Sequence, residues 1–170
     1  MSETDMILKI TALDLLSKAD YPLNNKQITE FFIDGNYADY FNVQQVISSL
    51  VDTKMIDMEQ GANESKYRIT DEGLETLELF RERITESIEE EIKSFYAKNG
   101  LQMKKENSVF SDYYRSANGG FYVHLRMMEE NKNIMDFTFQ VMTEAQAEAI
   151  CTNWKQKYED VYGILMDTLM

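Results

Sequence analysis

Two side chains in the sequence have the chemistry of catalysts, His124 and Cys151, and each is the only residue of its type. Histidine moves protons near neutral pH, and a cysteine thiolate is a strong nucleophile. His124 falls in an alternating segment beside Tyr122 and Arg126, where we interpret it as a surface or interface residue and not as a catalyst. Cys151 follows Ile150 in a helical pattern, which favours a buried or half-buried structural thiol.

Other signatures of catalysts and cofactor sites are absent from the sequence. One histidine and one cysteine are too few for a Cys/His zinc site within one chain. The sequence contains neither a GxxxxGK[ST] loop nor a GxGxxG motif, so the usual phosphate-binding signals are missing. The carboxylates stand in helical runs such as Glu89–Glu91, which suit a solvated face better than an acid–base pair. We therefore expect no enzyme activity, no metal and no cofactor.

Hydrogen bonding to the edges of DNA bases is a second kind of chemistry, and it is available between residues 40 and 54. Four apolar residues recur there with the spacing of a buried helix face: Val43, Val46, Ile47 and Leu50. Four positions off this face are uncharged and polar, two Gln and two Ser; Gln can pair with adenine and Ser with several bases. The predicted base-reading residues are Asn42, which is also the expected N-cap, Gln44, Gln45, Ser48 and Ser49.

Two short segments with alternating apolar and polar residues follow this helix and predict a two-stranded ribbon. They are joined by residues 60–64, which contain the Gly and Asn that suit a hairpin turn. Lys66 and Arg68 fall on one face of the second segment. Together with Lys54, which precedes the ribbon, they are the predicted contacts to backbone phosphate.

Two more helices are expected before the third one, over residues 6–19 and from Asn24 or Asn25 to Gly35. Three short helices followed by a β-ribbon are the order of a winged helix-turn-helix. A generic helical bundle would explain the helices alone, and the ribbon is what favours the winged helix. We assign residues 1–70 to this domain.

A single long helix is expected next, from about residue 71 to residue 98, with Lys98-Asn99-Gly100 as the signals for its end. We assign residues 71–99 to this connecting helix. This helix is longer than the small domain of residues 1–70 can cover, so we expect it to contact the C-terminal part, a second subunit, or both. The residues predicted to make a homodimer are Ile84, Ile88, Ile92, Phe95, Tyr158 and Leu165.

Residues 100–170 change to a β pattern and then return to a helix. Three segments alternate as an antiparallel sheet with one apolar face, and Thr143 is the expected N-cap of a long terminal helix. This part would serve sensing or dimerisation. Four aromatic residues suit either an effector pocket or ordinary sheet packing: Tyr113, Tyr114, Phe121 and Tyr122. The expected class is thus α+β: a winged helix-turn-helix, a connecting helix, and a three-stranded antiparallel sheet with one long helix.

The charge of the chain weighs against a simple DNA-binding protein. The formal net charge is −13, and residues 1–70 hold 6 basic and 11 acidic side chains. Because DNA affinity depends on Lys and Arg, we expect weak binding at physiological salt. The alternative is a protein-interaction module with a winged-helix fold, whose acidic surface binds a basic partner.

The location expected from the sequence is the cytoplasm. No apolar run approaches the roughly 20 residues that span a bilayer, and the N-terminus has no pattern of a secretory signal. One cysteine excludes an internal disulfide, which agrees with a reducing compartment.

Two resemblances add to these interpretations. The run LVDTKMI followed by KYRITDEGLETL resembles PadR- and MarR-type regulators, in which Tyr67, Ile69, Thr70 and Gly73 fit the end of the ribbon and the next helix. Along most of its length the chain also resembles a bacterial winged-helix family of unknown function, in PLNNKQITEFF, YFNVQQVISSL and YRITDEGLETLELF, with Trp154 matching in the last helix. The resemblance implies a cytoplasmic, dimeric transcription regulator, and it supplies no activity or effector ligand.

Overall fold

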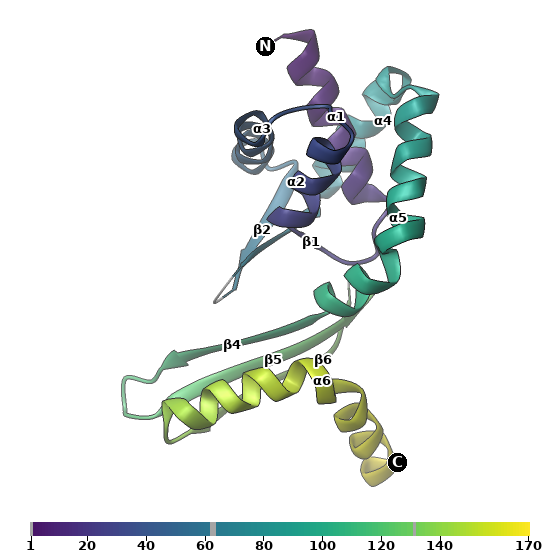
Figure 1. Ribbon diagram of the computed structural model, residues 1–170. Helices are drawn as coiled ribbons and strands as arrows, with labels where there is room; N and C mark the ends of the chain where they lie inside the picture. The colour runs from purple at the N-terminus through teal and green to yellow at the C-terminus, as the bar shows by residue number, and fades with distance from the viewer. Residues whose placement is uncertain (1, 62–63, 131) are drawn as a thin grey trace. The chain divides into compact units, whose positions relative to one another are not determined.

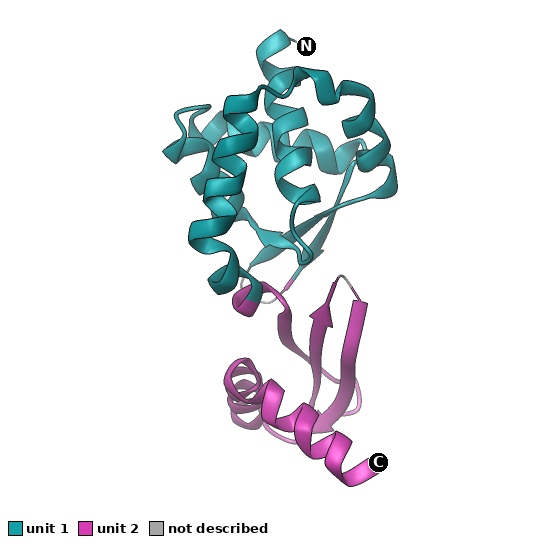
Figure 2. Cartoon of the chain, turned by 90° about the vertical axis from the view of Figure 1, so that its right-hand side faces the viewer, with its two compact units in different colours: residues 1–60, 64–104 teal, residues 61–63, 105–170 magenta. Residues whose placement is uncertain are grey.

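The computed structural model describes residues 2–61, 64–130 and 132–170. Within these residues the fold is α+β, with six α-helices and two three-stranded antiparallel sheets (Figure 1). The chain forms two compact units (Figure 2). Unit 1 contains residues 2–60 and 64–104, and unit 2 contains Gly61 and the described residues from 105 to 170. None of the described helices combines the length and the apolar character that crossing a membrane requires.

Unit 1 holds five of the helices and one sheet. In chain order its elements are α1 (Glu3–Ser17), β1 (Leu23–Asn24), α2 (Asn25–Asp34), α3 (Tyr40–Asp52), β2 (Ile56–Gln60), β3 (Ser65–Ile69), α4 (Asp71–Phe80), the 3₁₀ turn η1 (Arg81–Arg83) and α5 (Glu86–Asn107). The sheet order is β1-β3-β2, so the predicted two-stranded ribbon is part of a larger sheet. The prediction missed β1 because two residues are too few to show an alternating pattern. The predicted turn at 60–64 includes positions 62 and 63, which lie outside the described residues.

Side-chain caps fix where the helices of unit 1 begin. Asn24 and Gln27 form a capping box at α2, as their spacing predicts. The third helix begins two residues earlier than its predicted cap at Asn42. The Asp39 carboxylate accepts the backbone N–H of Asn42 at 2.9 Å, so Asp39 is the N-cap and Asn42 lies in the first turn.

The prediction of one helix from 71 to 98 is wrong. After α4 and η1 the backbone of Ile84 is extended, and a new helix, α5, begins directly after Thr85. The Thr85 hydroxyl accepts the N–H of Ile88 at 3.3 Å, and its carbonyl accepts the N–H of Glu89 at 3.1 Å. This local cap competes with helix continuation. The apolar spacing stays in phase across the break, which is why the sequence pattern does not show it.

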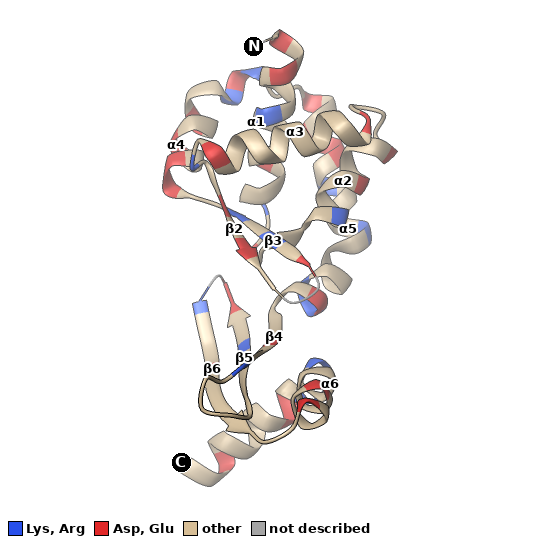
Figure 3. Ribbon diagram, turned by 90° about the vertical axis from the view of Figure 1, so that its left-hand side faces the viewer, with Lys and Arg blue, Asp and Glu red and all other residues tan. Residues whose placement is uncertain are grey.

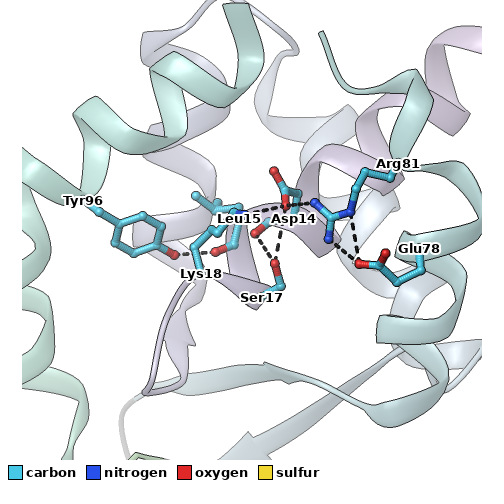
Figure 4. A network of polar contacts seen from close by, with 7 residues as sticks. All are labelled: Asp14, Leu15, Ser17, Lys18, Glu78, Arg81 and Tyr96. Atoms are coloured by element: carbon cyan, nitrogen blue, oxygen red, sulfur yellow. Dashed lines mark hydrogen bonds and ion pairs between the residues drawn. The ribbon is translucent and has the colours of Figure 1, made fainter. Parts of the chain in front are cut away.

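A polar network ties this break to α1 (Figure 4). Asp14 is fully buried, and its Oδ1 lies 3.7 Å from Nη1 of Arg81 and 3.6 Å from Nζ of Lys18. Arg81 also donates through Nε to Glu78 at 3.0 Å. The Tyr96 hydroxyl donates to the carbonyl of Leu15, the residue after Asp14, and this hydrogen bond holds α5 against α1. The buried Asp14 carboxylate is therefore paired with two cations of unit 1, Lys18 and Arg81.

The predicted end of this helix at Lys98–Gly100 is also wrong, because α5 continues to Asn107. Gly100 has no left-handed backbone, so it does not form the usual glycine C-cap. Its carbonyl accepts the Tyr21 hydroxyl at 3.1 Å. Met103, one turn beyond, is buried in the core of unit 1, and this packing carries the helix past the glycine.

Unit 2 has the predicted β-β-β-α order. Its elements are β4 (Val109–Arg115), β5 (Phe121–Glu129), β6 (Lys132–Val141) and α6 (Glu144–Leu169), with sheet order β4-β5-β6. Thr143 and Gln146 form the expected capping box. Trp154 packs in the core against the sheet and donates its Nε1–H to the carbonyl of Arg126 at 3.0 Å. The turn predicted at 130–133 includes position 131, which lies outside the described residues.

The four aromatic residues considered for an effector pocket do not share one. Tyr113 and Phe121 pack on the α6 side of the sheet with ring centroids 6.1 Å apart. Neighbouring strand residues point to opposite faces, so Tyr114 and Tyr122 pair on the other face, 5.5 Å apart. Sheet packing explains all four.

Candidate nucleic-acid interface

The outward face of α3 is the main candidate for a binding surface. The apolar residues of this helix are buried in unit 1, as their spacing predicts. On the opposite side, Phe41, Gln45, Ser48 and Asp52 are all exposed, and their spacing of four, three and four residues puts them on one line of the helix. We call these four residues the α3 stripe. Figure 3 shows α3 without Lys or Arg along it.

Aromatic residues form the N-terminal end of this surface, which the sequence analysis did not include. Phe41 is 79% exposed and Tyr40 is 54% exposed. Their rings meet edge to face with centroids 6.0 Å apart. Exposed apolar side chains that lie together mark a contact surface more often than apolar residues scattered singly over the surface do. The signal was available in the sequence, because Phe41 lies one turn before Gln45.

Gln44 does not belong to the outward surface. Its Oε1 accepts from Nδ2 of Asn25 at 2.8 Å, and its Nε2 donates back to Oδ1 of Asn25 at 3.0 Å. The same nitrogen lies 3.1 Å from Oγ1 of Thr29. Gln44 therefore joins α3 to α2 and sets the angle at which the stripe is presented. The other predicted base readers, Asn42 and Ser49, lie beside the stripe, with Asn42 exposed and Ser49 half-buried.

Of the three predicted phosphate contacts, Lys66 is too buried to reach DNA, whereas Arg68 and Lys54 are still candidates. Lys66 is only 5% exposed, and its Nζ lies 3.7 Å from Oε1 of Glu64. Strand β1 pairs Asn24 with Lys66, and Asn24 donates to the same Glu64 carboxylate at 3.1 Å. Alternation within β3 alone predicts that Lys66 points outward. The structure shows that Lys66 is enclosed, because β1 pairs with β3 beside it. Arg68 is half-buried on the same strand.

Lys54 is exposed directly after α3 and has a left-handed backbone, with φ of 59°. Its carbonyl accepts the Thr70 hydroxyl at 2.7 Å, so this turn is fixed to the start of α4. Lys26, at the start of α2, is exposed and lies 3.6 Å from Glu30. Acidic residues stand at both ends of α3, Asp39 as its N-cap and Asp52 as its last residue.

The residues predicted to form a dimer lie mostly in the chain's own cores. Ile88 and Ile92 are 5% and 2% exposed in the core of unit 1, which leaves them no surface for a second subunit. Ile84 and Phe95 pack against the same core. Tyr158 and Leu165 pack against the core of unit 2. For the four residues of unit 1, the physical reason is the break at Thr85, which lets α5 pack along the rest of unit 1.

The two catalytic candidates have settings that suit a structural role. His124 Nε2 lies 2.6 Å from Oδ1 of Asp136 in an exposed pair on the sheet. Cys151 is half-buried, and burial raises the pKa of its thiol, which disfavours the nucleophilic thiolate. Among the described residues, His, Cys, Asp and Glu form no group of three or more suited to a metal ion.

Comparisons with known proteins identify the family and leave the activity open. The chain belongs to the family described as Domain of unknown function (DUF4364), which matches residues 8–169. No curated protein matched the sequence. Among solved structures, the chain is similar to the Rio2 kinase from Chaetomium thermophilum, in the crystal structure of its ADP/Mg²⁺-phosphoaspartate complex, with a TM-score of 0.37. That alignment has 16% identity and covers 84% of this chain, which spans 34% of the kinase chain.

Proposed function

We propose that this member of the family is a non-enzymatic, cytoplasmic transcription regulator that binds DNA through a winged helix-turn-helix in unit 1. The order α1-β1-α2-α3-β2-β3, with β2 and β3 as the wing, supports the proposal. The observation that carries it is the α3 stripe, an exposed line of base-compatible side chains on the third helix. A homodimer would present two such helices to two half-sites.

The stripe suits the major groove in size and in chemistry. A helix of 13 residues such as α3 is about 20 Å long, and the major groove admits one α-helix. Gln45 can pair with adenine, and Ser48 can donate to or accept from several bases. The Gln44–Asn25 amide pair would hold the helix at a fixed angle while these residues make contact.

Phosphate contacts would come from Lys54, Arg68 and Lys26, a small set for a DNA-binding surface. Three neutralised phosphates per protomer give a slope of about −2.7 in log affinity against log salt. Binding by one protomer should therefore fall by about 40-fold between about 50 and 200 mM salt. The acidic balance of unit 1 makes low salt the appropriate condition for the first measurements.

The test is titration of the full chain with fluorescent genomic DNA fragments at low salt. The variant Lys54→Glu/Arg68→Glu should lose binding, because it replaces two phosphate contacts with repulsion. Lys93→Glu/Lys98→Glu is the matched control, since it makes the same change in net charge on α5. Equal binding by both variants, or no binding by the wild type, would show that the wing and the turn after α3 have no such role.

A second candidate is a protein-interaction module that uses the same face. The exposed Tyr40–Phe41 pair favours it, with Asp39 next to the pair and Asp52 at the other end of α3, because an apolar anchor on a face with acidic ends is complementary to a basic partner. Asp52→Lys separates the two candidates. It should strengthen DNA binding under the first proposal, whereas under the second it should weaken binding of an arginine-rich peptide.

A further inference from the structure

The α3 stripe carries information about which DNA would be bound, as well as whether DNA is bound. Its N-terminal end is an aromatic ring that is 79% exposed, and the next position along the line is an exposed amide, Gln45. We infer that Phe41 and Gln45 are specificity-determining residues that select duplex DNA with a thymine about two base pairs from an adenine. This inference rests on the proposed function and adds the sequence class to it.

The chemistry of the two side chains sets the preference. In the major groove only thymine presents a methyl group, and apolar side chains, Phe included, recognise it by contact. Phe41 has no hydrogen-bonding group. The polar atoms on the other base edges would therefore lose their hydrogen bonds to water on contact with the ring and gain none in return. Gln45 carries both a donor and an acceptor, which match the N6 and N7 positions of adenine.

The geometry of the helix sets the spacing between the two contacts. Phe41 and Gln45 are one turn apart on the same line of α3, which is a rise of about 6 Å. Base pairs follow one another every 3.4 Å or so, so the two contacts would fall about two base pairs apart on a helix that lies along the groove. The neighbouring amide, Gln44, is held by Asn25 and Thr29, which leaves Gln45 as the adenine reader.

The remaining residues of the stripe do not produce this preference. Ser48 can hydrogen-bond with several bases and therefore discriminates little. Asp52 offers only acceptors, and the usual partner of a carboxylate in the major groove is the N4 amino group of cytosine. It also stands at the C-terminal end of the helix, two residues before Lys54. The selectivity for A·T pairs is thus confined to the N-terminal half of α3.

The experiment begins with selection of bound duplexes from a random pool by the full chain at low salt. Each thymine of the enriched duplex is then replaced by deoxyuridine, which removes only the methyl group. At the contacted position the wild type should lose about fourfold in affinity, the value of one methyl group withdrawn from an apolar contact. Phe41→Ala should bind the thymine and uracil duplexes equally, because it has lost the ring that senses the methyl.

Leu79→Ala is the matched control. Leu79 is an apolar residue of α4 that is 76% exposed, so its removal tests the loss of an exposed apolar side chain away from the stripe. This variant should keep the fourfold penalty for uracil. Far-ultraviolet circular dichroism of each variant should match the wild type, since both side chains are exposed.

The outcomes separate this inference from the proposed function. Enrichment of A·T-containing duplexes, with a uracil penalty that disappears only in Phe41→Ala, supports both. Enriched DNA without a thymine dependence, or with a penalty that persists in Phe41→Ala, overturns the inference and leaves DNA binding in place. A pool from which no duplex is retained overturns the proposed function and this inference together.

Discussion

Replacing Gly73 with alanine should destabilise unit 1, although alanine is the better helix former. Gly73 lies in the first turn of α4, and a Cβ built on it would stand 2.1 Å from the carbonyl oxygen of Met55 and 2.8 Å from Cγ1 of Ile69. The Met55 oxygen is held in place by Thr70, which donates to it through its backbone N–H at 3.1 Å and through its hydroxyl at 3.0 Å, a proton shared with the Lys54 carbonyl. The obstacle is therefore backbone that is fixed by two hydrogen bonds.

The size of the effect follows from these contacts. Overpacking of this kind costs about 1–3 kcal/mol, and displacing the Met55 carbonyl would weaken hydrogen bonds worth about 1 kcal/mol each. The higher helix propensity of alanine stabilises the folded state by about 1 kcal/mol and offsets part of this cost. The net loss is about 2–4 kcal/mol, which with a urea m-value of about 2 kcal/mol per molar corresponds to a midpoint lower by about 1–2 M.

Urea unfolding followed by circular dichroism measures this change, and fluorescence adds a local signal. The only tryptophan, Trp154, lies in unit 2, so its transition reports on the other core. Gly163→Ala is the control, because nothing lies within 4 Å of the Cβ it would add to α6. That change should stabilise α6 by about 0.5–1 kcal/mol. A Gly73→Ala protein as stable as the wild type would refute the packing account of the α4 start.

Three further predictions concern α5 and the aromatic cluster beside it. Ile92→Ala should cost about 2–5 kcal/mol in urea unfolding and leave the oligomeric state seen by light scattering unchanged, whereas dissociation of an oligomer would contradict burial in the chain's own core. Thr85→Ala should cost about 1 kcal/mol through the lost cap of α5, and an unchanged melting curve would show that the cap is unimportant. Burial, and then the hydrogen bond and charge of Glu91, raise the pKa of Tyr37 to about 12. The folded state therefore retains this proton longer than the unfolded state, and the contribution is complete below pH 10 and lost as pH rises towards 12; Tyr37→Phe should flatten this part of the alkaline stability curve, and an unaltered curve would exclude the assignment.

Local signals in the sequence predicted much of the fold. Cap pairs three residues apart, such as Asn24 with Gln27 and Thr143 with Gln146, gave the starts of two helices because the hydrogen bonds involved are local. The alternation of the segments that form β4 to β6 predicted the antiparallel sheet of unit 2. The break at Thr85 was not predictable from spacing, since apolar residues on both sides stay in helical phase.

The candidate site was less predictable, because its decisive contacts cross between elements. Gln44 looks like a base reader in the sequence, and only the position of Asn25 on α2 shows that its amide is occupied. Lys66 looks like an outward cation until β1 and Glu64 enclose it. In contrast, Phe41 was within reach of sequence reasoning, because it continues the outward line of Gln45 and Ser48.

The central claim is that the outward face of α3 binds DNA, and sequence enrichment from a random duplex pool tests it most directly. The wild-type chain should enrich a defined sequence at low salt. Gln45→Ala/Ser48→Ala, which keeps the fold and net charge, should lose that enrichment and retain only weak, sequence-independent binding. Identical enriched sequences from both proteins, or none from the wild type, would contradict the claim.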